Sequence, residues 1–378
     1  MIYLDNAATT KLEPTCAQVI DKYNQEYYFN PSALYNVSSS LAKQIDIARQ
    51  DIISKLGGDI NANLIFTSGA TEANNLAIFG SASLKQKTYL FSVGEHPAVY
   101  NTAIALKNSG FKVEFIPLNS QGQVDLEAFE NLMNEDVCFV SVMLVNNETG
   151  AINDIKAIRQ IIDSKSKQTK LHVDAVQGFC KIPFSVKSLK IDLCTISAHK
   201  IHGPKGVGAL YIAPNCNVKN ITYGGGQEKG IRSGTYNVSG IMGFGQAVNV
   251  AYQDMQKNYQ YIENLKKQFI KNLQPIEKYI VINGNDSPYI LSLSIDGIRG
   301  ETVLHMLESE GVIIGTGSAC SSSKVENRVL QNMGRTKSQI LGSIRISFSK
   351  YNTMQEIESA SKVMVEAIQR LLAMSKRK

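Results

Sequence analysis

The sequence predicts an α/β protein in which a large, mostly parallel β-sheet is flanked by helices and a smaller α+β domain follows it. Three observations lead to this fold class. Short β-branched runs alternate with helical stretches between about residues 64 and 212. The pattern changes after Gly245. The chain has 378 residues, and 43% of them are hydrophobic, which is enough for more than one core.

The first two-thirds of the chain contain the alternation of strands and helices. Helical stretches at residues 71–84 and 155–164 lie between some of the strands. Strand, helix and strand in this rhythm form parallel sheets that helices cover on both faces, and ligands of such folds bind at the carboxyl ends of the strands. The expected strands are residues 64–67, 88–93, 112–118, 137–145, 171–174, 193–197 and 207–212.

The last third of the chain has a different pattern. A long helix is expected at about residues 246–273, and alternating strands separated by helices follow it. This pattern predicts a smaller α+β domain that closes over the first. We expect residues 15–250 to form the large domain, and residues 1–14 with residues 251–378 to form the small one. The expected strands of the small domain are residues 279–282, 290–295 and 343–348.

Charge, apolar runs and cysteines argue against several classes of protein. The net charge of +6 comes without a dense basic segment, so direct nucleic-acid binding is not expected. The longest strongly apolar run, residues 137–145, is too short for a membrane span, and no secretory signal is visible. Six scattered cysteines without a CxxC pair are typical of reduced thiols in the cytoplasm. The absence of GxGxxG and of any Gly-Lys dipeptide leaves no motif for a nicotinamide enzyme or a P-loop ATPase.

Polar residues follow the ends of two strands in the middle of the chain. Asp174 ends a buried strand, where a carboxylate is costly unless it is paired, although it could instead cap the next helix. Lys200 follows the strand at residues 193–197 among small residues and is a candidate Schiff-base nucleophile, although an isolated lysine is more often a surface residue. Ser197 and His199 flank it and offer donors for an anion.

Three other strand ends carry related signals. The turn at Ala70 and Thr71 opens a helix, whose free amides make an anion site unless the turn is a plain cap. His96 could stack on a planar ring or exchange protons, and Asn147 follows the most apolar strand. Together the strand ends place an acid, a lysine, an anion site, a stacking histidine and an amide on one sheet. Pyridoxal 5'-phosphate needs all of these.

Five longer motifs follow one another along the chain: SGATEANNLAI, HVDAVQ, SAHKIHGPKGVGALY, GGGQEKGIRSGT and GSACSSS. With them the sequence resembles the cysteine desulfurases of the NifS/IscS type, which belong to the class V aminotransferase superfamily of fold-type I pyridoxal-phosphate enzymes. The resemblance runs nearly end to end, from Tyr3 to Ser347. It implies the fold of a fold-type I transferase, pyridoxal 5'-phosphate as cofactor, and conversion of L-cysteine to L-alanine. No metal site is expected.

The resemblance also implies roles around the cofactor ring. Lys200 would bind the cofactor covalently, Asp174 would pair with the ring nitrogen, and Gln177 would contact the ring oxygen. His96 would stack on the ring and assist proton transfer, and either His96 or Lys200 is the base. The implied cofactor-binding residues are Ala70, Thr71, His96, Asn147, Asp174, Gln177, Ser197, His199, Lys200 and Thr235.

The resemblance implies that the cofactor phosphate is bound by Thr71, Ser197 and His199 of one subunit. Thr235 would reach the phosphate of a neighbouring subunit, which implies a homodimer. Asn147 and Arg345 would bind the substrate carboxylate, a task that suits the two-pronged guanidinium group.

Cys320 lies in a Gly/Ser-rich segment, which is a poor setting for a core residue. It could be an incidental exposed cysteine, but the resemblance implies that its thiolate attacks the sulfur of L-cysteine and carries it as a persulfide to an acceptor protein. Another class V reaction, such as that of a selenocysteine lyase or an aminotransferase, is the alternative. The expected acceptor is a tRNA-thiolating enzyme or an iron–sulfur scaffold, and the short C-terminal tail favours the first.

Overall fold

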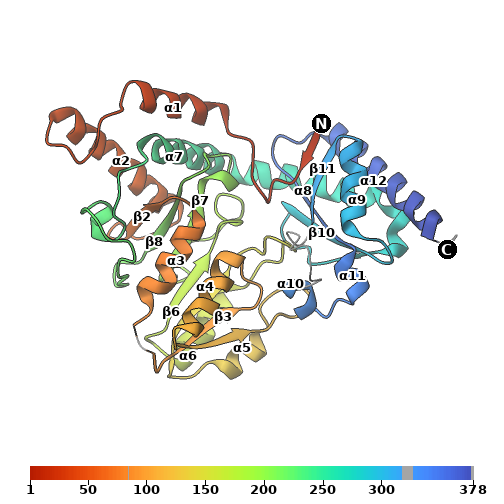
Figure 1. Cartoon of the computed structure of the whole chain (residues 1–378), viewed down its shortest axis with the longest axis horizontal. Coiled ribbons are helices and arrows are strands. Elements are labelled where there is room, and N and C mark those ends of the chain that lie inside the picture. The colour runs from red at the N-terminus through yellow and green to blue at the C-terminus, as the bar shows by residue number, and fades with distance from the viewer. Residues whose placement is uncertain (84, 317–326, 376–378) are drawn as a thin grey trace.

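The computed structural model describes residues 1–83, 85–316 and 327–375. The chain forms two lobes, each built on its own β-sheet (Figure 1). It begins in the smaller lobe, crosses into the larger one and then returns. A site between the lobes can therefore receive residues from both ends of the chain.

The sheet of the large lobe has seven strands. They are β2 (Asn63–Thr67), β3 (Thr88–Ser92), β4 (Lys112–Ile116), β5 (Val137–Met143), β6 (Lys170–Asp174), β7 (Leu193–Ser197) and β8 (Gly208–Ile212). Their order is β2-β8-β7-β6-β5-β3-β4, and β8 runs antiparallel to both of its neighbours, whereas the other pairs are parallel. The expected mostly parallel sheet is therefore confirmed.

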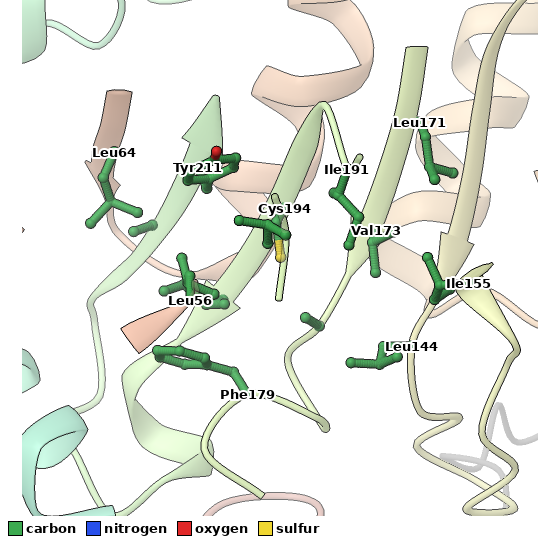
Figure 2. Close-up of a cluster of buried hydrophobic side chains, with 14 of the residues drawn as sticks. Leu56, Leu64, Leu144, Ile155, Leu171, Val173, Phe179, Ile191, Cys194 and Tyr211 are labelled. Atoms are coloured by element: carbon green, nitrogen blue, oxygen red, sulfur yellow. The ribbon is translucent and has the colours of Figure 1, made fainter. Parts of the chain in front are cut away.

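Helices cover both faces of this sheet. They are α1 (Pro14–Gln25), α2 (Asn36–Lys55), α3 (Ala70–Ser81), α4 (Pro97–Asn108), α5 (Leu126–Leu132), α6 (Ile155–Lys165) and α7 (Val238–Gln253), with short turns η1 (Ala198–Lys200) and η2 (Glu228–Gly230). Side chains of α2, α6 and α7 pack on one face and those of α3 and α4 on the other. Figure 2 shows the first of these cores, where Val173 and Cys194 of the central strands lie among other buried hydrophobic residues. Burial on both faces explains why these strands are continuous apolar runs.

The sheet of the small lobe is mainly antiparallel. Its strands are β1 (Ile2–Leu4), β9 (Ile280–Ile282), β10 (Ile290–Ile295), β11 (Val312–Thr316) and β12 (Ser343–Ser347), in the order β1-β11-β12-β10-β9. β1 and β11 pair in parallel, and the other described pairs are antiparallel. The sequence did not predict β1 or β11, because a strand of three residues such as β1 shows no periodicity and depends on its distant partner.

The helices of the small lobe are α8 (Met255–Asn272), α9 (Gly300–Ser309), α10 (Arg328–Asn332), α11 (Lys337–Leu341) and α12 (Met354–Ser375), with the turn η3 (Gln274–Tyr279). Side chains of α8, α9 and α12 share one core with the five-stranded sheet. The last helix begins with a reciprocal cap, in which Thr353 N donates to Glu356 Oε2 at 3.0 Å and Glu356 N donates to Thr353 Oγ1 at 3.2 Å. In the described ranges no helix is long and apolar enough to cross a membrane.

The single helix expected at residues 246–273 is wrong. The chain leaves the helical conformation at Asp254, where φ is −98° and ψ is 7°, so that α7 and α8 are separate helices. α7 buries Phe244 and Val248 in the core of the large lobe, whereas α8 buries Ile262 and Leu265 in that of the small lobe. Because of the break, two consecutive helices can pack their apolar side chains into different cores. The domain boundary at about residue 250 stays a prediction.

Candidate active site

The carboxyl ends of β2, β3, β5, β6 and β7 meet at one edge of the large sheet. Residues at these ends surround a cavity of about 800 Å³, and Asp5, Gly315, Thr316 and Arg345 of the small sheet and its loops complete the wall. The predicted site residues that line this cavity are Ala70, Thr71, His96, Asn147, Asp174, Gln177, Ser197, His199, Lys200 and Arg345.

One end of the cavity is suited to an anion. The N-cap of α3 is Gly69, which has no side chain to accept hydrogen bonds from the first turn, so the turn keeps its amides for a ligand. A Cβ on Gly208 of β8 would lie 2.8 Å from the carbonyl carbon of Gly69 and 3.0 Å from Ala70 N. A glycine is therefore required where β8 passes this turn. Burial, with nearby lysines, lowers the pKa of His199 to about 4, so this lining residue presents a neutral ring.

Asp174, the last residue of β6, lines the cavity and is almost completely buried. Its Oδ2 accepts from Asn74 Nδ2 at 2.9 Å, and its Oδ1 accepts from the backbone N of Val176 at 3.0 Å. Each oxygen has one donor from the protein and keeps a lone pair for another. The carboxylate is thus oriented, and no cation among the described residues forms an ion pair with it, which suits a protonated ring nitrogen as its partner.

Lys200 follows β7 at the turn η1 and reaches the N-terminal segment. Its Nζ donates to the carbonyl oxygens of Ala7 at 2.6 Å and Ala8 at 2.7 Å. Burial lowers its pKa to about 8, and Arg345 adds to this effect, while Asp5 and Asp174 oppose it. An amine with this pKa is partly neutral near physiological pH, which a nucleophilic lysine requires.

His96 is the N-cap of α4, and its Nδ1 accepts from Ala98 N at 3.1 Å. This contact fixes the ring at the cavity wall and leaves Nε2 for the cavity. The pKa of His96 is lowered, first because the surrounding protein desolvates the ring, although one side of it stays open to the cavity. The neutral ring can accept a proton at Nε2.

Arg345 of β12 closes the cavity on the side of the small lobe. Its Nη1 donates to Asn147 O at 2.9 Å and its Nη2 to Asp5 Oδ1 at 2.8 Å. Its buried Nε has no hydrogen-bond partner among the described residues. A buried donor without an acceptor is costly, so Nε indicates where an anionic group of a ligand binds.

Two carboxyl groups beside the site were not predicted from the sequence. Glu95 precedes His96 and is 1% exposed, and neither of its oxygens has a hydrogen-bond partner in the described part of the chain. Burial, with the charge of Asp174, raises its pKa well above the usual value. Glu148 lines the cavity and its pKa is also raised by burial. The position of Glu95 next to His96 in the sequence could have drawn attention to it, but the local sequence does not show that its carboxyl group is buried.

Cys320 lies outside the described residues, so its predicted role is not tested by the geometry. The chain is described up to Thr316, which lines the cavity, and again from Asn327. Asn327 Nδ2 donates to Oε2 of Glu148, another lining residue, at 2.7 Å. Both described ends of the segment that contains Cys320 are therefore at the cavity.

Thr235 is the predicted cofactor-binding residue that does not line the cavity. It is exposed in the loop between η2 and α7. Its position leaves it free to contact another molecule.

The family model described as Aminotransferase class-V matches residues 2–359. The chain belongs to this family. The cysteine desulfurase IscS of Clostridium botulinum is 35% identical to it over 383 residues, which cover 99% of this chain and 96% of that protein. A cysteine desulfurase of Nostoc sp. is 36% identical over 381 residues, with coverages of 99% and 94%. A solved NifS-like protein superposes with a TM-score of 0.91 at 34% identity, over 98% of this chain and 99% of that one. The expected fold class and family are confirmed.

Class-V aminotransferases use pyridoxal 5'-phosphate, and the cavity fits this cofactor. The free amides of α3 suit its phosphate, and Asp174 has a lone pair for its ring nitrogen. Lys200, with its lowered pKa, lies within the same cavity. These features agree with the chemistry of the cofactor without any rearrangement of the sheet.

Proposed function

We propose that this protein is a cysteine desulfurase that converts L-cysteine to L-alanine and collects the sulfur on Cys320. The observation that carries the proposal is the position of the described ends of the Cys320 segment. Thr316 and Asn327 both lie at the cavity that holds Lys200 and Asp174. An aminotransferase has no need of a cysteine in such a position, whereas a sulfur-transferring enzyme requires one.

Arg345 and Asn147 are proposed to bind the substrate carboxylate. The unpaired Nε of Arg345 is a charged donor, and such donors form strong hydrogen bonds with carboxylates. The substrate would then be held between the small lobe and the floor of the large sheet. This contact orients the substrate but does not itself break a bond.

The bound cofactor supplies an electron sink for the substrate. Lys200 at Nζ or His96 at Nε2 accepts the α-proton, because both side chains have lowered pKa values and line the cavity. The Cys320 thiolate then attacks the substrate sulfur. The S–S bond forms as the C–S bond breaks, and the electron pair of the C–S bond remains on the β-carbon, which takes a proton to become the methyl group. Return of a proton to the α-carbon then completes alanine.

Thr235 is proposed to act at the cavity of a partner subunit in a homodimer. Exposed hydrophobic side chains on loops and helix starts of the large lobe support this proposal, because such surface is usually covered. Sedimentation equilibrium should give twice the mass of the chain, and a monomer at micromolar concentration would contradict the dimer. The exposed residues include Tyr28, Leu34, Tyr35 and Tyr223.

The persulfide is proposed to pass to another protein in the cytoplasm, either a tRNA-thiolating enzyme or an iron–sulfur scaffold. A persulfide on Cys320 would have to leave the cavity to reach a second protein, and the described ends of the Cys320 segment, Thr316 and Asn327, lie at this cavity. Transfer of ³⁵S to each purified candidate distinguishes the two acceptors.

The experiment that tests the proposed function is the Cys320→Ser variant. It should bind the cofactor with the absorbance of the unchanged protein but release alanine and sulfide from L-cysteine at least about 10³-fold more slowly. Cys138→Ser is the matched control, because Cys138 is the one partly exposed cysteine of the described residues and lies away from the cavity. Full turnover by Cys320→Ser would exclude the proposed mechanism.

A further inference from the structure

Lys181 is a buried lysine beside the active site to which the proposed reaction gives no role. It lies in the turns after β6 and is 8% exposed. Its Nζ donates to Gln177 Oε1 at 3.1 Å and lies 5.5 Å from the centre of the Tyr289 ring. Among the described residues it forms no ion pair, and the charged group that acts on it most is Lys200. A buried amine without a carboxylate is costly and calls for an explanation.

The two contacts of the Gln177 carboxamide fix its orientation. Oε1 accepts from Lys181 Nζ, and Nε2 donates to Ala7 O at 2.9 Å. A lysine ammonium can only donate and a backbone carbonyl can only accept, so the reversed amide would lose both hydrogen bonds. The second N–H of Nε2 remains, and Gln177 lines the cavity. The carboxamide is therefore set to present a donor to a ligand.

The same hydrogen bonds connect Lys181 to Lys200. Ala7 O accepts from Gln177 Nε2 and also from Lys200 Nζ at 2.6 Å. Both lysines line a small cavity of about 30 Å³ behind the active site, which has space for one or two water molecules. No acidic residue is among the described residues that line it. Lys181 is therefore connected to the active site by its hydrogen bond to Gln177 and not by an ion pair among the described residues.

We propose that Lys181 is a positioning residue that holds the Gln177 carboxamide with its N–H toward the cavity, where it donates to the ring oxygen of the bound cofactor. The inference rests on the proposed role of Gln177. A neutral amine also has N–H groups, so the contact to Oε1 persists if Lys181 loses its proton.

Lys266 shows what a purely structural buried lysine looks like in this chain. It is 4% exposed, and its Nζ donates to the backbone carbonyl of Ser287 at 2.7 Å. Lys266 thus fastens a loop of the small lobe, whereas Lys181 holds the side chain of a residue in the active site. Lys266→Met is therefore the matched control for Lys181→Met.

The test is a pH titration of the absorbance of the bound cofactor. A donor to the ring oxygen favours the form in which this oxygen is negative, so loss of the donor raises the midpoint of the titration. The hydrogen bond is of ordinary strength, and Lys181→Met should raise the midpoint by about 0.5–1 unit. Lys266→Met should leave the midpoint unchanged. Lys181→Leu removes the same donor and replaces Lys181→Met if that variant does not fold.

A double-mutant cycle separates positioning from a direct effect of charge. In a Gln177→Leu background, Lys181→Met should produce no further shift, because its effect passes through the amide. An equal shift in both backgrounds, or no shift in either, would overturn the proposal. If the unchanged protein fails to bind the cofactor, no variant gives the absorbance, and it is the proposed function that fails.

Discussion

Two buried carboxyl groups of the large lobe have opposite surroundings. Glu228, near the outer strand β2, accepts from Arg49 Nη1 at 2.7 Å, from Arg49 Nη2 at 2.9 Å and from the backbone N of Phe66 at 2.8 Å. Glu95, at the end of β3 beside the cavity, has no hydrogen-bond partner among the described residues. The chain itself satisfies the first carboxyl group, whereas the described residues leave the second without a donor.

The same contrast holds for the other buried polar atoms. Among the described residues, the charged or amide atoms without a partner belong to Asn74, Glu95 and Arg345, and the rest are hydroxyls of Ser38 and Ser81. Arg345 lines the cavity, and Asn74 contacts Asp174, which also lines it. Apart from these two hydroxyls, the unsatisfied polar atoms of the described residues lie at or beside the cavity, where a ligand can use them.

Arg49→Met tests the completed region and should have the largest effect on stability. It leaves the Glu228 carboxylate buried without its cation, which costs about 3–5 kcal/mol in the free energy of unfolding. Urea denaturation measures this loss. Asp46→Asn is the control, because Asp46 contacts the same guanidinium from the exposed side at 3.3 Å, and a loss there should stay below about 1 kcal/mol. Equal losses of unfolding free energy in the two variants would show that the buried Arg49–Glu228 pair is no more important than the exposed contact to Asp46.

Arg345→Gln tests the open region through substrate binding. Loss of a charged hydrogen bond should raise KM for L-cysteine about 10- to 100-fold, because a charged donor contributes about 1.5–3 kcal/mol. Steady-state kinetics measure the change. Asp5→Asn removes the ion pair of Arg345 but keeps Nε, so its KM should rise much less. If both variants raised KM equally, Nε would not be the carboxylate site.

Glu95→Gln should have the smallest effect and a characteristic dependence on pH. Burial, with the charge of Asp174, raises the folded-state pKa of Glu95 well above the ordinary value for a glutamate, so folding favours the protonated form. The stability from this group is complete below about pH 4.5 and is lost as pH rises toward the folded-state pKa. The neutral glutamine avoids this loss. Relative to the unchanged protein, the variant should become more stable as pH rises above about 4.5, by less than about 1.4 kcal/mol per pH unit. A constant difference would show that Glu95 is ionised in the fold.

Short motifs made much of the site predictable from the sequence. Asp174 ends a strand whose apolar run is visible, Thr71 and Lys200 each follow one, and parallel strands end at the same edge of a sheet. A motif at a strand end therefore predicts both the residue type and its location at this edge of the sheet. This is why the predicted residues at those ends line one cavity.

Features that depend on distant pairing were not predictable in this way. Arg345 contacts Asp5 because β1, β11 and β12 bring the two ends of the chain together. The break at Asp254 depends on which core each helix meets, and a helical period does not show this. Lys181 follows Gln177 by one helical turn in sequence, but its burial depends on Tyr289 of the other lobe.

The cavity at the strand ends is proposed to hold pyridoxal 5'-phosphate on Lys200. Borohydride reduction of the cofactor-loaded protein, followed by digestion and mass spectrometry, identifies the lysine to which the cofactor is attached. We predict the phosphopyridoxyl group on Lys200 alone. A group on Lys181 or Lys205, or no stable attachment to any lysine, would contradict the account.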